Sequence, residues 1–380
     1  TGQFRFDSRF SDQEQSALYG VENKVDQNTT RIRLNLLKRL ANGVSFFGRF
    51  QGDGGNASTW IKAYIDAALP WDINLRAGRQ AVDWAGDVYW APFGTWQTDG
   101  LLTDRDGLEA FYFTKNFAMG EFGIYASRAD KGSETDNNGN PVAGVDGDEH
   151  WEFAARAVFN FNEQFSLKLG YQMIDFQNDQ VAGVVANDAS FGTWYVEPKV
   201  IFTPNFILKG AYYSQNSNSA DSGNVDAGAF NDPKAWRAIF EVKQEALKFT
   251  SLWLEYNQID AGFVTPNSAA FAFIADVSAY APLYQDYRNG GFGQIQQNTD
   301  ILRIGAFQKW SDQWETFVHY AKFSIDGFNG GFSNDATNYS LGVNYNYTPA
   351  LTFALAYDAW DAENDALDDH VIHFRTMVNF

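Results

Sequence analysis

The chain of 380 residues has no cysteine. This absence excludes a disulfide framework, thiolate metal sites and cysteine nucleophiles. Long hydrophobic runs are also missing: no stretch of about 18 apolar residues occurs, so the sequence predicts no transmembrane helix. Basic residues are in the minority, with 28 Lys and Arg against 47 Asp and Glu, and the net charge of −19 argues against a nucleic-acid partner. No signal peptide is visible at Thr1, so we expect an exported protein in its mature form.

Aromatic residues, by contrast, are abundant. The chain has 34 Phe, 18 Tyr and 12 Trp, together 17% of its residues. The mean hydropathy is nevertheless −0.36. Many rings in a chain that is polar on average are expected when strands alternate between lipid and water.

The segment 370–380 shows this alternation most clearly. Ile372, Phe374, Val378 and Phe380 share one parity, whereas His373, Arg375 and Asn379 share the other. A period of two predicts a strand with one apolar and one polar face. Residues 2–10 alternate in the same way. We predict that these first and last strands pair and close a barrel, because closure removes both free edges.

Segments of about ten residues with this pattern recur along the whole chain, joined alternately by short turns and long polar connections. Eighteen strands are predicted, at 2–10, 29–40, 44–52, 58–69, 73–81, 107–116, 120–129, 150–161, 164–176, 190–202, 206–216, 234–245, 248–258, 300–310, 314–324, 337–347, 351–360 and 369–380. An even number places both termini on the side of the short turns. The fold class is therefore an all-β transmembrane antiparallel barrel of about 18 strands in a single domain, with 16 strands as the alternative.

Two further patterns support a membrane barrel. Aromatic residues flank the short turns, as in the pairs Phe202/Phe206 and Trp310/Trp314, and such rings collect at the membrane boundary. Along the strands, one parity is nearly free of charge, whereas the other carries residues such as Lys168, Arg237, Arg303 and His319. Charged side chains on an inner face need water or partners. We therefore expect a water-filled lumen.

With these patterns the chain resembles the outer-membrane porins of Gram-negative bacteria over essentially its whole length. The resemblance rests on the terminal Phe380, the strand rhythm, the aromatic residues beside the turns and the third long loop, 82–106, whose Pro92-Phe93-Gly94 is similar to part of a porin turn. It implies passive diffusion of small hydrophilic solutes and ions, no cofactor and no enzymatic activity. It also implies a homotrimer in the outer membrane, in contact with lipid and lipopolysaccharide. In such porins the third loop folds into the barrel and narrows the channel.

The residues of the expected constriction carry opposite charges. The acidic set, in or beside loop 82–106, is Asp83, Asp87, Asp99, Asp104 and Asp106. The basic set, on inward faces of the first strands and the last, is Arg5, Arg31, Arg33, Arg49, Arg76 and Arg375. An acidic loop facing a basic wall would create a transverse field that orients dipolar solutes. The alternatives are a loop that covers the barrel rim and arginines that brace the barrel by pairing with nearby carboxylates.

Other readings of the sequence remain open. The connection 130–149 contains Asp136, Asp146 and Asp148, whose oxygens are possible Ca²⁺ ligands, but the spacing is not that of an EF-hand and a solvated acidic loop is the preferred interpretation. The alternative function is a substrate-specific channel for a sugar or an organic anion. A barrel enzyme is less favoured because no nucleophile or metal-ligand motif is present. A transporter with an N-terminal plug is not expected, since the first strand starts near residue 2.

Overall fold

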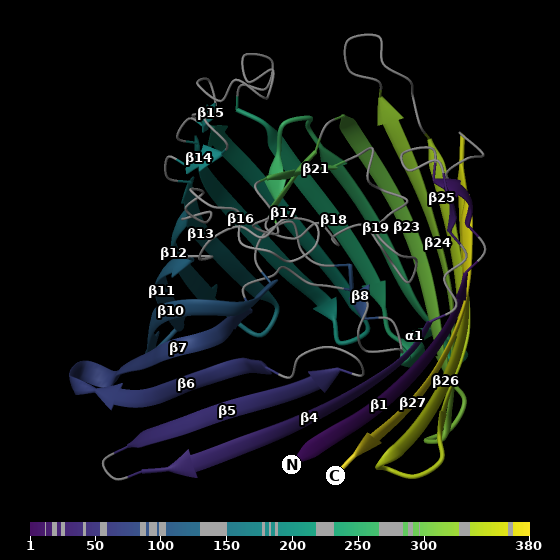
Figure 1. Cartoon of the computed structure of the whole chain (residues 1–380), viewed down its shortest axis with the longest axis horizontal. Coiled ribbons are helices and arrows are strands. Elements are labelled where there is room, and N and C mark those ends of the chain that lie inside the picture. The colour runs from purple at the N-terminus through teal and green to yellow at the C-terminus, as the bar shows by residue number, and fades with distance from the viewer. Residues whose placement is uncertain are drawn as a thin grey trace.

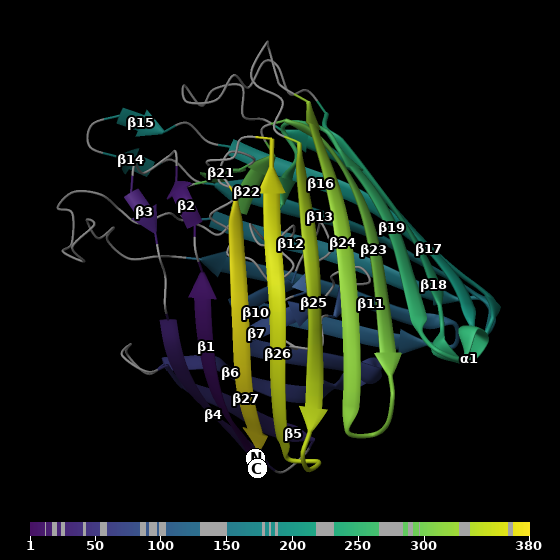
Figure 2. The same cartoon turned by 90° about the vertical axis from the view of Figure 1, so that its right-hand side faces the viewer.

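The computed structural model describes the chain outside residues 12, 17–20, 24–26, 41–42, 54–58, 84–88, 91–96, 99–103, 130–149, 177–178, 182–183, 187–188, 218–231, 266–283, 288–291, 296, 327–334 and 364–367. The described residues form one 18-stranded antiparallel sheet that closes on itself (Figures 1 and 2). This confirms the predicted barrel and its strand number. None of the described helices is long and apolar enough to cross a membrane.

The barrel strands agree with the predicted segments to within a few residues. They are β1 (Gly2–Ser11), β4 (Gln27–Arg39), β5 (Val44–Asp53), β6 (Thr59–Leu69), β7 (Ile73–Asp83), β10 (Asp104–Phe117), β11 (Gly120–Ala129), β12 (His150–Asn160), β13 (Phe165–Phe176), β16 (Ala189–Thr203), β17 (Phe206–Ser217), β18 (Lys234–Val242), β19 (Ser251–Ile259), β23 (Asn298–Lys309), β24 (Trp314–Asp326), β25 (Ala336–Asn346), β26 (Leu351–Ala362) and β27 (Asp369–Asn379). Each pairs with the neighbouring barrel strands along the chain.

Short elements lie in the connections. The pairs β2 (Gln13–Ser16) with β3 (Val21–Asn23), β8 (Tyr89–Trp90) with β9 (Gln97–Thr98), and β14 (Asp179–Val181) with β15 (Val184–Ala186) form two-stranded sheets. A three-stranded sheet contains β20 (Val264–Thr265), β21 (Tyr284–Tyr287) and β22 (Phe292–Ile295). The turn between β6 and β7 is the 3-10 helix η1 (Pro70–Asp72).

The first and last strands close the barrel as predicted. β27 pairs with β1 in a register that places Gln3 opposite Asn379 and Ser11 opposite Val371. The two termini lie side by side at the end that carries the short turns (Figures 1 and 2). A Cβ atom at residue 2 would overlap the ring of Phe380, so glycine at this position lets that ring lie against β1.

The outer face of the barrel is apolar. Large hydrophobic side chains stand exposed on strand after strand, among them Leu34, Leu169, Leu341 and Leu355. Their neighbours of opposite parity point into the barrel. In water such a surface would be unfavourable, whereas lipid accommodates it. The wall is therefore that of a membrane-spanning barrel.

One turn differs from the prediction. We expected the strand that begins at Lys234 to continue to residue 245, but β18 ends at Val242 and is followed by the single-turn helix α1 (Gln244–Leu247). The four residues Gln, Glu, Ala and Leu all favour helix, which overrides the strand pattern here. Lys248 ends the turn in a left-handed conformation with φ of 70°, and its N–H donates to the carbonyl of Gln244.

Candidate functional site

The inner face of the barrel carries many buried polar and charged side chains. They include Asp7, Glu152, Arg237, Glu241, Glu255, Arg303, His319, Asp358, His373 and Arg375. Strand alternation aims them inward, because the residues on either side of each one lie on the outer parity. Almost every buried charge requires a partner. The partners differ between two regions of the wall.

The first region is the arginine wall. We use this name for Arg375 on β27, Arg5 on β1, Arg31 and Arg33 on β4, Arg49 on β5 and Arg76 on β7. The strands β27, β1, β4, β5, β6 and β7 are consecutive neighbours in the barrel. Arg5 lies directly opposite Arg31. The six arginines predicted for the basic side of the constriction thus lie on one continuous stretch of the wall.

Half of the arginine wall is braced by carboxylates. Asp7 accepts hydrogen bonds from Nε of Arg375 at 2.6 Å and from its Nη2 at 3.1 Å. Nε of Arg5 lies 2.9 Å from the same carboxylate, and Nε2 of His373 lies 3.5 Å from it. Farther along the wall, Nε of Arg76 donates to Asp66 at 2.8 Å. Arg5, Arg76 and Arg375 therefore pair with nearby carboxylates, as the bracing alternative expects.

The other half contacts neutral amides. Arg31 donates to Oε1 of Gln3 at 3.0 Å. Arg33 donates to Oε1 of Gln51 at 2.6 Å, and Arg49 to Oδ1 of Asn35 at 2.7 Å. An amide oxygen satisfies a donor without cancelling its charge. In these contacts the guanidinium groups of Arg31 and Arg49 keep their positive charge.

The second region is the ion-paired wall, which extends from β11 to β23. Arg156 pairs with Glu121 at 3.3 Å, and Lys168 pairs with Glu197 at 3.3 Å. Lys209 also forms an ion pair, with Glu241. The sequence prediction did not name Glu121, Glu197 or Glu255 as lumen residues. Their signal was available, since each has the parity of an inward neighbour, such as Asn257 for Glu255.

Glu255 is a deeply enclosed carboxylate of this region, with 1% of its side chain exposed. Its Oε1 lies 3.1 Å from Nε of Arg237 and 3.2 Å from Nη1 of Arg303. Nε1 of Trp253 donates to Oε2 at 2.7 Å, and Nδ2 of Asn257 donates to Oε1 at 2.8 Å. Four donors on one carboxylate offset the cost of burying the charge.

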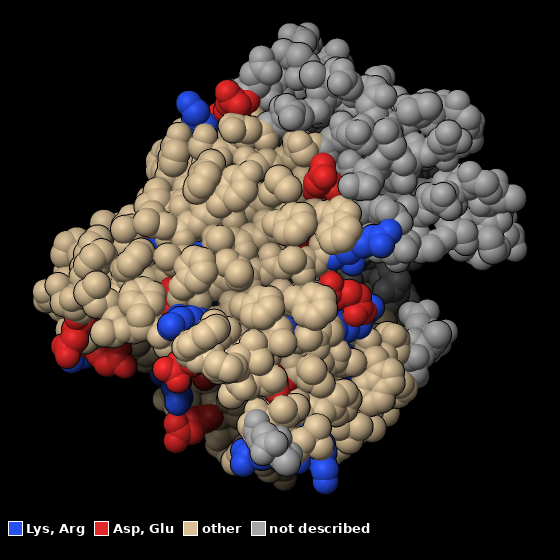
Figure 3. Space-filling model, turned by 90° about the vertical axis from the view of Figure 1, so that its left-hand side faces the viewer, with Lys and Arg blue, Asp and Glu red and all other residues tan. Residues whose placement is uncertain are grey.

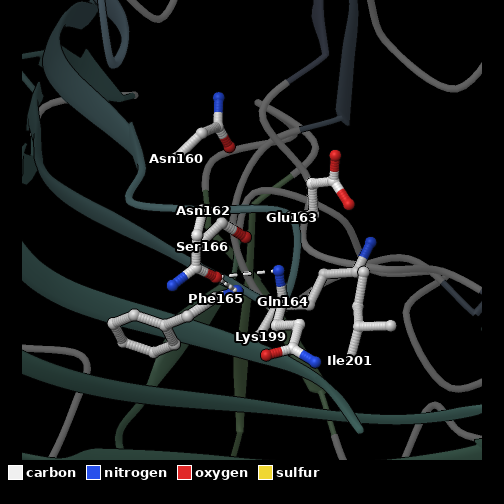
Figure 4. Close-up of a pocket in the computed structure, with 8 residues that line it drawn as sticks. All are labelled: Asn160, Asn162, Glu163, Gln164, Phe165, Ser166, Lys199 and Ile201. Carbon is white, nitrogen blue, oxygen red and sulfur yellow. Dashed lines mark hydrogen bonds between the residues drawn. The ribbon is translucent and has the colours of Figure 1, made fainter. Parts of the chain in front are cut away.

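Cavities open toward the turn end of this wall. One, of about 530 Å³, is lined by Asn160, Asn162, Glu163, Gln164, Phe165, Ser166, Lys199 and Ile201 (Figure 4). Oδ1 of Asn162 accepts hydrogen bonds from the backbone N–H groups of Gln164 and Phe165, both at 2.8 Å, which fixes the turn beside it. A second cavity, of about 170 Å³, shares Ser166 and Lys199 and reaches Arg237. These polar spaces belong to the lumen.

Toward the other end the inner face becomes apolar. Ile259, Phe263, Ile301 and Phe323 are all at most 1% exposed. Phe263 follows β19, and its ring meets that of Tyr213 edge-on at 6.4 Å between centroids. These side chains belong to one apolar cluster, so this part of the inner face is packed rather than lined by charged groups. The sequence prediction did not name Phe263 as part of the inner face, and no motif was available for it.

The acidic residues of the predicted constriction lie where the structure does not describe side chains. Asp87 and Asp99 lie outside the described residues. Asp83, Asp104 and Asp106 lie in β7 and β10, but their side chains are not among those described. The proposed Ca²⁺ ligands Asp136, Asp146 and Asp148 also lie outside the described residues. Within the described part of the chain, no three His, Asp or Glu side chains gather as a metal site.

Comparisons with known proteins extend these observations. No protein-family model matches the chain, and no curated protein matches it. Solved structures do match: OccK8 (OprE) of Pseudomonas aeruginosa has a TM-score of 0.60 at 10% identity, with 99% of this chain and 96% of that chain covered. OccD3 (OpdP) of the same organism has a TM-score of 0.58 at 14% identity, covering 100% and 90%. The outer-membrane protein OprD, also from Pseudomonas aeruginosa, has a TM-score of 0.58 at 12% identity, covering 99% and 92%.

The chain has the fold of the OprD and Occ outer-membrane barrels. Identities this low establish the fold and not the solute. The predicted resemblance to outer-membrane porins is confirmed at the level of the fold.

Proposed function

We propose that this barrel is a porin, a water-filled channel through which small hydrophilic solutes and ions diffuse passively across the outer membrane. The observation that carries the proposal is the contrast between the two faces of the wall. Exposed leucines cover the outside, whereas ion pairs and arginine–amide contacts line the inside. Charged groups on the inner face of a membrane barrel are typical of an aqueous pathway.

A second candidate is a substrate-specific channel for an organic anion. Two observations favour it over a wide general pore. Inner-wall side chains such as Gln215 and Asp358 are completely buried, which indicates a narrow passage. Arg31 and Arg49 contact amides, so their charge is available to an anion that passes between them. Guanidinium groups bind carboxylates well because their donors match the two oxygens.

The acidic residues of loop 82–106 form the other half of the proposed constriction. Asp83, Asp87, Asp99 and Asp104 would oppose the arginine wall, so that the two charge sets partly cancel. Charges at the mouth act over about a Debye length, roughly 8 Å at physiological salt, whereas charges inside a narrow passage are screened less. We therefore expect a weakly selective channel whose cation preference grows as salt is lowered. The homotrimer implied by the resemblance stays a prediction.

Single-channel recording in planar bilayers tests the proposal. The purified barrel should give discrete conductance steps, and a salt gradient should give a small reversal potential. The double variant Asp99→Asn/Asp104→Asn should shift that potential toward anions. An intact barrel without conductance would contradict the porin function. If the channel conducts but its reversal potential is unchanged in this double variant, only the acidic constriction is contradicted.

A further inference from the structure

A row of polar side chains crosses the inner face of the ion-paired wall, close to its short turns. It consists of Asn160 on β12, Ser166 on β13, Lys199 on β16 and Lys209 on β17. The register places each of these residues directly opposite the next one. Inward side chains in such positions have Cβ atoms about 4.5–5.5 Å apart. We call these four residues the turn-end row.

The turn-end row faces the lumen. Residues of the same parity on these strands are buried, namely Glu152, Gln172, Thr193 and Gln215. Outward neighbours such as Leu169 are exposed, and the outer face on the side of β12 is mostly uncharged (Figure 3). Asn160, Ser166 and Lys199 line both turn-end cavities, and Lys209 lines the smaller one (Figure 4). The row is therefore open to a solute in the lumen.

The two lysines of the row differ in their partners. Like charges directly opposite each other destabilise a sheet, so Lys199 and Lys209 each need an anion nearby. Lys209 has one, since its ammonium group pairs with Glu241. That carboxylate is shared, because Nζ of Lys243 lies 3.1 Å from its Oε2. Glu241 thus already holds two ammonium groups.

Lys199 lacks such a carboxylate among the described residues. Glu197, two positions away on the same face of β16, lies 3.3 Å from Nζ of Lys168 and accepts a hydrogen bond at 2.9 Å from the Tyr213 hydroxyl. Glu163 borders the larger cavity but stands exposed in the turn. Within the described part of the chain, no carboxylate forms an ion pair with Lys199. The wall thus leaves one positive charge of the turn-end row uncompensated.

The donors of the row suit a phosphate group better than a carboxylate. Two ammonium groups act as separate point charges, and a hydroxyl and an amide add donors from two further strands. Donors spread over four strands match an anion with several oxygens in a tetrahedron. A planar carboxylate is matched better by the guanidinium groups of the arginine wall. The smaller cavity, of about 170 Å³, has room for one such ion, since a water molecule occupies roughly 30 Å³.

We propose that the turn-end row binds a phosphate group, either as free inorganic phosphate or as the phosphomonoester of a small solute. The ammonium groups of Lys199 and Lys209 lie on either side of the bound group, and the Ser166 hydroxyl and the Asn160 amide donate to its oxygens. The proposal deepens the channel function and rests on its water-filled lumen. It gives the lumen an anion site on a different wall from the arginines.

Isothermal titration calorimetry with inorganic phosphate tests this site on the purified barrel in detergent. We expect saturable binding, and Lys199→Gln should weaken it about tenfold or more, because a charged donor is lost. Lys199→Arg keeps the charge and should retain most of the affinity. The matched control is Lys38→Gln, which removes the same charge from the outer face of β4, next to a short turn, and should leave binding unchanged.

Three results would overturn the proposal. They are no saturable binding to the folded barrel, binding that Lys199→Gln weakens no more than Lys38→Gln does, and acetate that binds as tightly as phosphate. Heat-modifiable gel migration shows which variants are folded. If Lys199→Gln does not fold, Ser166→Ala keeps the test decisive, because it should weaken binding about threefold or more by removing a hydroxyl donor.

A second ligand identifies the source of the phosphate group. If glycerol 3-phosphate binds more tightly than inorganic phosphate and Lys199→Gln weakens both, the site takes a phosphomonoester, whereas the reverse order supports free phosphate. Calorimetry does not require conduction. A barrel that conducts but binds no phosphate refutes this site alone, and a barrel that binds phosphate without conducting refutes the porin function alone.

Discussion

The arginine wall and the ion-paired wall face the same lumen, yet their cations have different partners. On the ion-paired wall, Lys168 and Arg237 contact carboxylates. On the arginine wall, Arg31 and Arg49 contact amide oxygens. Carboxylate partners cancel charge and tie strands together, whereas amide partners hold a cation in place and leave its charge to act on the solute. The comparison separates stability from selectivity within one barrel.

The largest effect is expected on the ion-paired wall. Glu255→Gln removes the charge that Arg237 and Arg303 share and leaves two buried guanidinium groups close together. Breaking a buried ion pair by changing one partner costs about 3–5 kcal/mol. Urea unfolding of the barrel refolded in lipid vesicles measures this loss. A cost below about 1 kcal/mol would show that the two walls do not differ in this respect.

A smaller loss is expected at the barrel closure, on the arginine wall itself. Asp7→Asn leaves Arg5 and Arg375 without their shared carboxylate, but Arg5 is 16% exposed and keeps some contact with water. We expect a cost of about 2–3 kcal/mol, at or just below the low end of the range for a buried pair, because water partly screens Arg5. The folded fraction, measured by heat-modifiable gel migration over a urea series, reports it. If Asp7→Asn is less stable than Glu255→Gln, the depth of burial does not determine which of the two ion pairs contributes more to stability.

Ion selectivity should depend on the arginine wall rather than on the ion-paired wall. Arg31→Gln/Arg33→Gln removes two positive charges and should shift permeability toward cations. A screened electrostatic contribution of about 0.5–1 kcal/mol corresponds to a change of about two- to fivefold in the permeability ratio. Reversal potentials in a salt gradient measure it. The matched control Lys168→Gln/Glu197→Gln removes one charge of each sign. If that control shifts the reversal potential equally, the two walls do not differ in their effect on selectivity.

The smallest effect is expected from an amide partner. Asn35→Ala removes the acceptor that Arg49 contacts at 2.7 Å. One hydrogen bond is worth about 0.5–1.5 kcal/mol in net stability, and this one lies where water can replace the amide. We expect the low end of that range in urea unfolding. A loss comparable to that of Glu255→Gln would mean that the amides support the barrel as strongly as the carboxylates do.

Much of this architecture was predictable because the period of two is strong and local. Arg375 and Arg5 could be placed on one wall once the first and last strands were predicted to pair. The pairing of Glu255 with Arg303 was not predictable in the same way, since their register is set across the long connection between β19 and β23. The helix α1 was missed where strand pattern and helix propensity compete. The ion pair between Arg79 and Glu109 breaks the expectation of a nearly charge-free outer face, and it lies toward the loop ends of β7 and β10.

The ion pair that closes the barrel has a consequence for how the chain assembles. Asp7 and Arg375 are 368 positions apart, whereas Arg237 and Glu255 are only 18 apart. Contacts between distant positions form slowly, because the entropy of closing the intervening loop opposes them until the rest of the sheet is in place. The hairpins can therefore form in order along the chain. The backbone groups of β1 on the side that faces β27 stay unpaired until β27 is added. The barrel is thus most vulnerable to misassembly in its last step, with one strand left to add.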